Sequence, residues 1–152
     1  MAYPSHFAPA TLSQNIERIE QLKPDTQPEW GKMNAAQMLA HLNVAYDIET
    51  GAIATKPNFI MRFLARTFAK KIVTGPKPYP RNMRTAPVFI VPEEQDFDRE
   101  KVKLIGHMRR VADGGKEQYD GKENVSFGKL TAGEWSTLYQ KHLDHHLTQF
   151  GV

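Results

Sequence analysis

TAGEWSTLYQKHLDHHLTQF, residues 131–150, is the stretch that decides the fold class of this chain. Thr131 is followed three residues later by Glu134, which is the capping-box pattern of a helix N-terminus. Apolar residues then recur at helical spacing: Trp135, Leu138, Tyr139, Leu143, Leu147 and Phe150. Because this spacing places them on one side of a helix, the stretch predicts an amphipathic helix over residues 131–149 with one face in a core.

Three histidines lie within this predicted helix. His142 and His146 are four residues apart, so they lie on one face, about 6 Å apart along the axis, where two imidazoles can share a metal ion. His145 competes with His146, because a separation of three residues also brings side chains together. The apolar stripe is centred close to His146, with His142 toward one edge and His145 farther out. We therefore expect His142 and His146 to point inward and His145 to lie at the rim.

Four other segments show helical periodicity, and capping or turn residues mark their ends. The predicted helices cover residues 12–22, 34–49, 58–74 and 95–112. Asn34 and Gln37 form a second capping box, and Gly114–Gly115 follows the last of the four. No segment shows the convincing alternation of a strand. These patterns predict an all-α fold in a single domain, residues 1–152: a four-helix bundle with an additional short N-terminal helix.

The third predicted helix is basic and amphipathic. Its apolar stripe consists of Phe59, Ile60, Phe63, Leu64, Phe68 and Ile72. The chain has no acidic residue between Glu49 and Glu93, and a proline-rich loop over residues 76–92 follows the helix. One interpretation of the basic segment 56–84 is a patch for nucleic acid or a membrane surface. The solvated face of a bundle helix is the simpler interpretation, so we expect neither partner.

The chain contains no cysteine, which excludes disulfides, thiolate metal sites, iron–sulfur clusters and a thiol nucleophile of its own. Any thiol chemistry must therefore use an external thiol. The N-terminal residues lack a basic segment followed by an apolar core, and no apolar run approaches the roughly 18 residues of a spanning helix. We accordingly expect a cytoplasmic protein.

A third inward histidine is expected on the second predicted helix. His41 lies beside Met38, Ala45 and Ile48 on a face that should look into the bundle. A buried imidazole needs hydrogen-bond partners or a ligand, and bundles often build metal sites from facing helices. Three neutral imidazoles would leave a coordination position open for water or substrate. The alternative is that these are ordinary surface or core histidines, because spacing alone does not make the two helices neighbours.

Two signatures lie near the ends of the chain. The first is Trp30-Gly-Lys-Met-Asn-Ala-Ala-Gln-Met-Leu-Ala-His41-Leu; the second is Phe127-Gly-Lys-Leu-Thr-Ala-Gly-Glu-Trp135, followed by Lys141-His-Leu-Asp-His-His-Leu-Thr-Gln149. In both residues and order they resemble the DinB-like (YfiT-like) superfamily, especially its branch of small metal-binding proteins. The family pattern falls on His41, His142, His146 and Gln149. Residues 58–121 carry no matching motif, and Asn124-Val125 stands where the family leads us to expect a histidine and a proline.

The resemblance implies a four-helix bundle, frequently a homodimer, in which the three histidines hold a divalent ion. Nickel or zinc is implied first, with iron or manganese as alternatives. Characterised members of the superfamily include metal-dependent transferases that use a low-molecular-weight thiol, and the corresponding expectation is a thiol transferase acting on small electrophilic substrates. A metal-dependent hydrolase and a non-catalytic metal- or ligand-binding protein are the alternatives.

No catalytic acid or base stands out in the sequence. Asn43, Asp47, Tyr139 and Asp144 are polar candidates only, each more simply an ordinary surface or core residue. Gln149 lies on the same helix face as His142 and could orient a ligand by a hydrogen bond.

Overall fold

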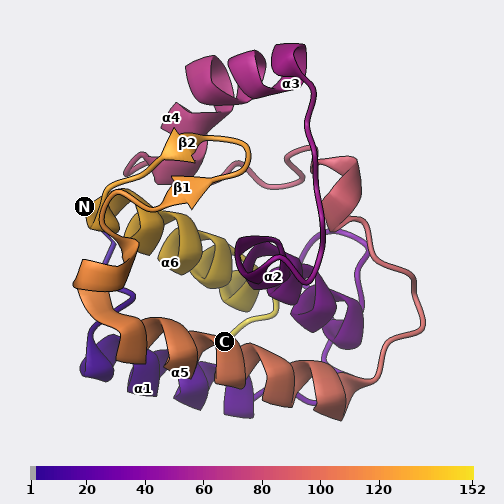
Figure 1. The fold of residues 1–152 in the computed structure, drawn as a ribbon. Coiled ribbons are helices and arrows are strands. Elements are labelled where there is room, and N and C mark those ends of the chain that lie inside the picture. The colour runs from indigo at the N-terminus through magenta and orange to yellow at the C-terminus, as the bar shows by residue number, and fades with distance from the viewer. Residues whose placement is uncertain (1–2) are drawn as a thin grey trace.

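The computed structural model describes residues 3–152 and is built mainly of helices (Figure 1). Met1 and Ala2, the first residues of the expected domain 1–152, lie outside the described residues. The long helices are α1 (Pro9–Glu20), α2 (Ala35–Thr50), α5 (Phe97–Tyr119) and α6 (Ala132–Gln149). Shorter elements are α3 (Phe59–Leu64), the π-helical turn η1 (Ala65–Ala69), α4 (Lys70–Thr74), the 3₁₀ turn η2 (Pro87–Phe89), β1 (Glu123–Asn124) and β2 (Gly128–Lys129). The expectation of an all-α class is confirmed.

One core lies between α1, α2, α5 and α6. Helix α2 packs against both α5 and α6, and α5 also contacts α1 and α6. Fully buried apolar side chains come from all four helices: Ile19, Met38, Leu39, Leu104, Met108, Trp135 and Leu147. Because α2 and α6 are direct neighbours, residues on their facing sides can meet.

Helices α2 and α6 begin where their capping boxes predict. The Asn34 side chain accepts a hydrogen bond from the Gln37 amide, and the Gln37 side chain accepts one from the Asn34 amide. Thr131 and Glu134 make the same reciprocal pair before α6. Each box satisfies two amides that lack helical partners, which fixes the first turn of both helices that carry candidate ligands.

Helix α5 extends beyond its predicted end at residue 112. Gly115 breaks the helical backbone with φ +66°, a conformation that glycine adopts without steric cost, but helical turns resume as far as Tyr119. The Tyr119 ring is fully buried against Phe7 and Trp135. Burial of this ring explains the extra turn, which the Gly114–Gly115 signal alone did not predict.

A two-residue antiparallel hairpin, β1 with β2, connects α5 to α6. It is too short to show the alternation by which a strand is recognised. The Asn124 side chain accepts hydrogen bonds from the amides of Ser126 and Phe127, and Gly128 has φ +73°. The asparagine that departs from the family pattern therefore closes the hairpin turn.

The third predicted helix forms in three pieces, α3, η1 and α4, but its apolar stripe does not join the core. No residue from Phe59 to Thr74 is buried, and α1 supplies the fourth core-lining helix instead. A sequence period identifies an apolar face but not what covers it, which is why the expected packing was wrong for this segment. None of the helices among residues 3–152 is both long and apolar enough to cross a bilayer.

A buried polar cluster joins the N-terminal segment to α6. The His6 Nδ1 lies 3.0 Å from the Gln140 carboxamide oxygen, so this nitrogen carries the proton and donates. The His6 Nε2 then accepts from the Tyr46 hydroxyl at 3.1 Å. The Asn15 side-chain Nδ2 also donates to the Gln140 carboxamide oxygen. The backbone amide of His6 donates to the Ser136 hydroxyl. Every hydrogen bond that the imidazole makes is that of its neutral form.

Candidate metal centre

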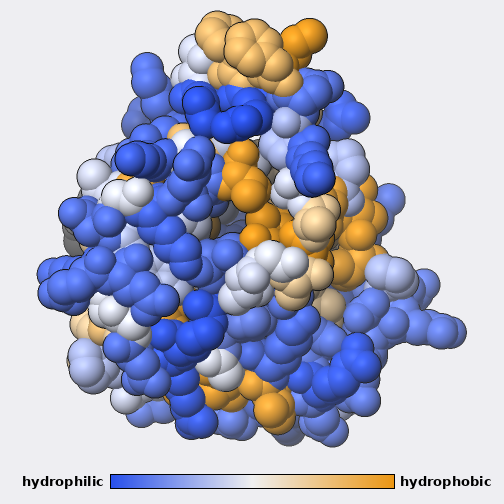
Figure 2. Space-filling view, viewed as in Figure 1, coloured by the Kyte–Doolittle hydropathy of each residue, from blue (hydrophilic) through white to orange (hydrophobic). Residues whose placement is uncertain are grey.

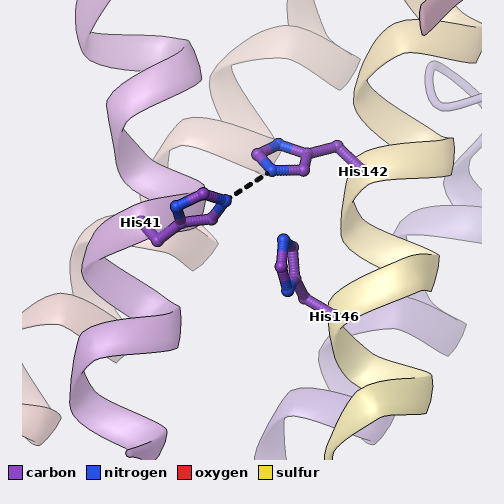
Figure 3. Close-up of side chains that lie close together, drawn as sticks. All are labelled: His41, His142 and His146. Atoms are coloured by element: carbon purple, nitrogen blue, oxygen red, sulfur yellow. Dashed lines mark hydrogen bonds between the residues drawn. The ribbon is translucent and has the colours of Figure 1, made fainter. Parts of the chain in front are cut away.

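His41, His142 and His146 come together between α2 and α6, and their ligand atoms all lie within 4.8 Å of one another. The Nε2 atoms of His41 and His142 are 2.9 Å apart. Figure 3 shows the three rings directed toward one shared space, one from α2 and two from successive turns of α6. The structure thus brings together the three residues that the sequence nominated.

Two of the rings are oriented by hydrogen bonds on the far side from this space. The His41 Nδ1 lies 2.9 Å from the Phe89 carbonyl oxygen, so it donates to it. The His146 Nδ1 lies 2.7 Å from the Gln149 carboxamide oxygen and donates likewise. In both residues the proton is thereby held on Nδ1, which leaves the lone pair of Nε2 free for a ligand.

Burial keeps the three imidazoles neutral. Loss of solvation lowers the pKa of His146 to about 3, and it lowers the pKa of His41 despite the opposing hydrogen bond to Phe89. It lowers the pKa of His142 well below its ordinary value, and the neighbouring histidines add to the shift. At neutral pH all three side chains are therefore available as metal ligands, because a metal binds the unprotonated ring.

Three neutral imidazoles fit a divalent ion in number and in chemistry. Zinc binds histidine nitrogen at about 2.0–2.1 Å, which separates the nitrogens around a tetrahedral ion by about 3.3 Å. The His41–His142 separation of 2.9 Å is slightly shorter than that value, and all three pairs lie within 4.8 Å. Three ligands leave a position for water or substrate, as in reactive sites rather than closed structural ones.

His145 lies outside this group, at the half-buried rim that the helical wheel indicated. Its ring meets the rings of Trp30 and Tyr79 edge to face, with centroids 5.9 Å and 5.6 Å away. Its ring centroid is also 5.0 Å from that of His146. Among the described residues, the geometry of the cluster selects His146, not His145, as the partner of His142.

Gln149 links the last helix to the loop before α2. Its carboxamide oxygen accepts from His146 and its Nε2 donates to the Trp30 carbonyl at 2.7 Å. A Cβ on Gly31, which has φ +85°, would lie 2.6 Å from that Nε2. The close approach of this loop to Gln149 therefore requires glycine at position 31.

Phe89 is the site residue that sequence reasoning missed. Its carbonyl orients His41, and its ring packs against the rings of His41 and His142, with centroids 5.5 Å and 5.8 Å away. Phe89 lies in the proline-rich loop, 48 positions from His41. No spacing rule connects the two, and the only sequence signal was the apolar run Val88–Val91 inside that loop.

The polar candidates other than Gln149 have structural partners elsewhere. Asn43 donates to the backbone and side chain of Glu100. Asp47 pairs with Lys103 and His107, and Asp144 pairs with Arg18. Tyr139 is buried and stacks on Tyr46. These contacts place the four residues in the packing of the fold, although the Tyr139 hydroxyl and the Asn43 Oδ1 have no hydrogen-bond partner among the described residues.

Replacing Gln149 with leucine is expected to weaken metal binding by roughly 10–100-fold, because His146 loses the acceptor that fixes its tautomer and orientation. The dissociation constant can be measured by competition with a chromophoric chelator. Thr148→Val, an exposed change on the same helix, is the matched control and should bind as the wild type does. Equal constants for Gln149→Leu and wild type would show that the hydrogen bond contributes nothing.

No curated protein and no solved structure matches this chain. A family model does match, over residues 4–151, a range that contains all three histidines of the cluster as well as Gln149 and Phe89. The chain therefore belongs to the family described as protein of unknown function (DUF1569).

Proposed function

We propose that this protein is a DinB-like four-helix-bundle enzyme, in which a divalent ion held by His41, His142 and His146 acts with a low-molecular-weight thiol on small electrophilic substrates. The observation that carries the proposal is the convergence of three neutral imidazoles from α2 and α6, two of them buried and that of His142 partly buried. Support for the bundle comes from the packing of α1, α2, α5 and α6 around one core. Nickel or zinc suits the nitrogen donors, and iron or manganese is the alternative.

The charge of the donor set favours an anionic fourth ligand. Three neutral histidines leave the two positive charges of the ion uncompensated, and the cluster includes no carboxylate among the described residues. A bound ion in such a site lowers the pKa of a thiol, so that thiolate forms at neutral pH. An external thiol fits this requirement, since the chain has no cysteine. The reduced cytoplasm, where we propose that the protein works, supplies such thiols.

The chain's own residues would then position and enclose the reactants. The Phe89 carbonyl and the Gln149 carboxamide hold two ligand rings in place. The Phe89 ring, which lies against two of the three ligands, gives one side of the site an apolar wall suited to a small substrate. In the transfer, the thiol proton passes to solvent, the new carbon–sulfur bond forms, and the bond to the leaving group breaks.

The first experiment is elemental analysis of protein purified without an affinity tag, followed by spectroscopy of the cobalt-loaded protein. Addition of a small thiol should produce a near-ultraviolet charge-transfer band of cobalt-bound thiolate, and the band should be missing in His142→Ala. Conjugation of an activated aryl halide with a panel of thiols should then depend on both metal and thiol. Bound metal with no turnover for any thiol would indicate a binding protein. Turnover of activated esters without thiol would indicate a hydrolase.

A further inference from the structure

The segment α3–η1–α4 presents an exposed apolar face, formed by Phe59, Ile60, Met61, Phe63, Leu64, Phe68 and Ile72. Exposed fractions reach 82% for Phe59 and 63% for Phe68. Figure 2 shows apolar side chains at the crest of the molecule, where Figure 1 places α3, and a further apolar area lower on the same face. So many large apolar side chains on one continuous helical segment mark an interaction surface, since single exposed apolar residues are the usual case.

Contacts with α6 anchor the C-terminal end of this segment. The Lys141 ammonium donates to the carbonyls of Ile72 and Gly75 at the end of α4. Lys70 pairs with Glu134 of α6 at 3.0 Å. To turn the apolar face inward, the protein would have to break these contacts and leave two backbone carbonyls without their donor. The C-terminal end of the segment is therefore anchored on α6 while its apolar side chains remain exposed.

The stretch of chain that carries this face is strongly basic. Residues 50–92 contain no aspartate or glutamate, and they contain eight cations: Lys56, Arg62, Arg66, Lys70, Lys71, Lys77, Arg81 and Arg84. Arg62 and Arg66 share one carboxylate, that of Glu123, at 3.9 Å each, and both remain nearly half exposed. The segment keeps a surplus of positive charge beside its apolar face.

We propose that this segment docks on an anionic lipid bilayer, with its apolar side chains in the interface and its cations against the headgroups. A helical segment with Phe and Leu on one side and Lys and Arg beside them is the composition that binds in the plane of a membrane surface. Charge decides between this occupant and a second copy of the chain. A symmetric pairing through the same face would bring two basic segments together, whereas an anionic bilayer complements them.

The proposal replaces the sequence-based expectation of no membrane partner. That expectation treated the segment as a bundle helix with only its basic face in solvent. In the structure the apolar stripe is exposed to solvent rather than buried in the bundle, and the core forms without it.

The test is flotation of the full-length protein with vesicles of phosphatidylcholine, alone or with about one-third phosphatidylserine. Wild type should float with the phosphatidylserine vesicles, and its affinity should fall by about tenfold or more without phosphatidylserine or at high salt. Phe63→Ser/Phe68→Ser, which alters two side chains at least 58% exposed, and Lys71→Glu/Lys77→Glu should each lose binding by about tenfold or more. Val102→Ser, at a 71% exposed apolar position of α5, is the matched control and should float as the wild type does.

Circular dichroism would establish that the variants are folded. No flotation of wild type with either vesicle, or equal flotation of wild type and the two double variants, would overturn the proposal. It would also be overturned if wild type sedimented as a dimer that the Phe63→Ser/Phe68→Ser change dissociates, because the face would then belong to a second copy.

Discussion

His142→Ala is expected to lose its bound metal, with an affinity at least about a thousandfold below that of wild type. His142 is one of three candidate ligands that the described residues bring together. Its loss should cost more than the roughly 10–100-fold that accompanies removal of a hydrogen-bonding partner of a ligand. The metal content of untagged protein, measured by elemental analysis after extensive dialysis, is the readout.

His145→Ala is the matched control, because the residue lies on the same helix, has its ring centroid 5.0 Å from that of His146, and is not in the ligand group. It should keep the metal content of wild type, whereas His41→Ala should lose metal as His142→Ala does. If wild type, His41→Ala and His142→Ala all carry the same trace amount, the three histidines do not form a metal centre.

Wild type is expected to lose about 3 kcal/mol more free energy of unfolding than His6→Gln between pH 7 and pH 4. Burial lowers the pKa of His6 from 6.5 to about 4, and the hydrogen bond to Gln140 offsets only part of that shift. Between pH 6.5 and about pH 4, His6 is mostly protonated in the unfolded chain but mostly neutral in the folded chain. The contribution of the neutral ring is therefore complete above pH 6.5, declines as the pH falls, and is lost near pH 4.

Urea denaturation at a series of pH values, with chelator present, measures this difference. Glutamine can still donate to the Gln140 oxygen and accept from Tyr46, but it does not titrate. Other groups that destabilise the protein in acid, including the buried ligand histidines, contribute to both proteins and cancel in the comparison. Parallel curves for wild type and His6→Gln would show that His6 is not held neutral in the fold.

The candidate ligands could be predicted because helical spacing carries direct information about faces. Two histidines four residues apart on α6 must share a face, and the apolar stripe identifies which face is buried. The first residues of α2 and α6 could also be predicted, because each capping box is a pattern of four consecutive residues. What the spacing could not supply was the contact between α2 and α6, which brings His41 to the pair.

Contacts between residues far apart in the sequence, and the exposure of one helix face, could not be predicted. The Phe89 carbonyl lies beside His41 because of the path that the loop takes. Every residue has a backbone carbonyl, so the residue type at position 89 does not reveal this hydrogen bond. The apolar stripe of Phe59 to Ile72 has the same pattern as one that joins a core, yet it is exposed. The extra turn of α5 depends on the Tyr119 ring finding a place beside Phe7 and Trp135.

The close approach of Gly31 to Gln149 couples the loop before α2 to the last turn of α6. A side chain at position 31 would contact the Gln149 carboxamide, which accepts the hydrogen bond that orients His146. Gly31 therefore affects the orientation of a candidate ligand that it does not contact. Substitutions at Gly31 and Gln149 should accordingly show non-additive effects on metal affinity, as residues in direct contact do. Position 31 should therefore tolerate few residues other than glycine, although it belongs to no ligand group.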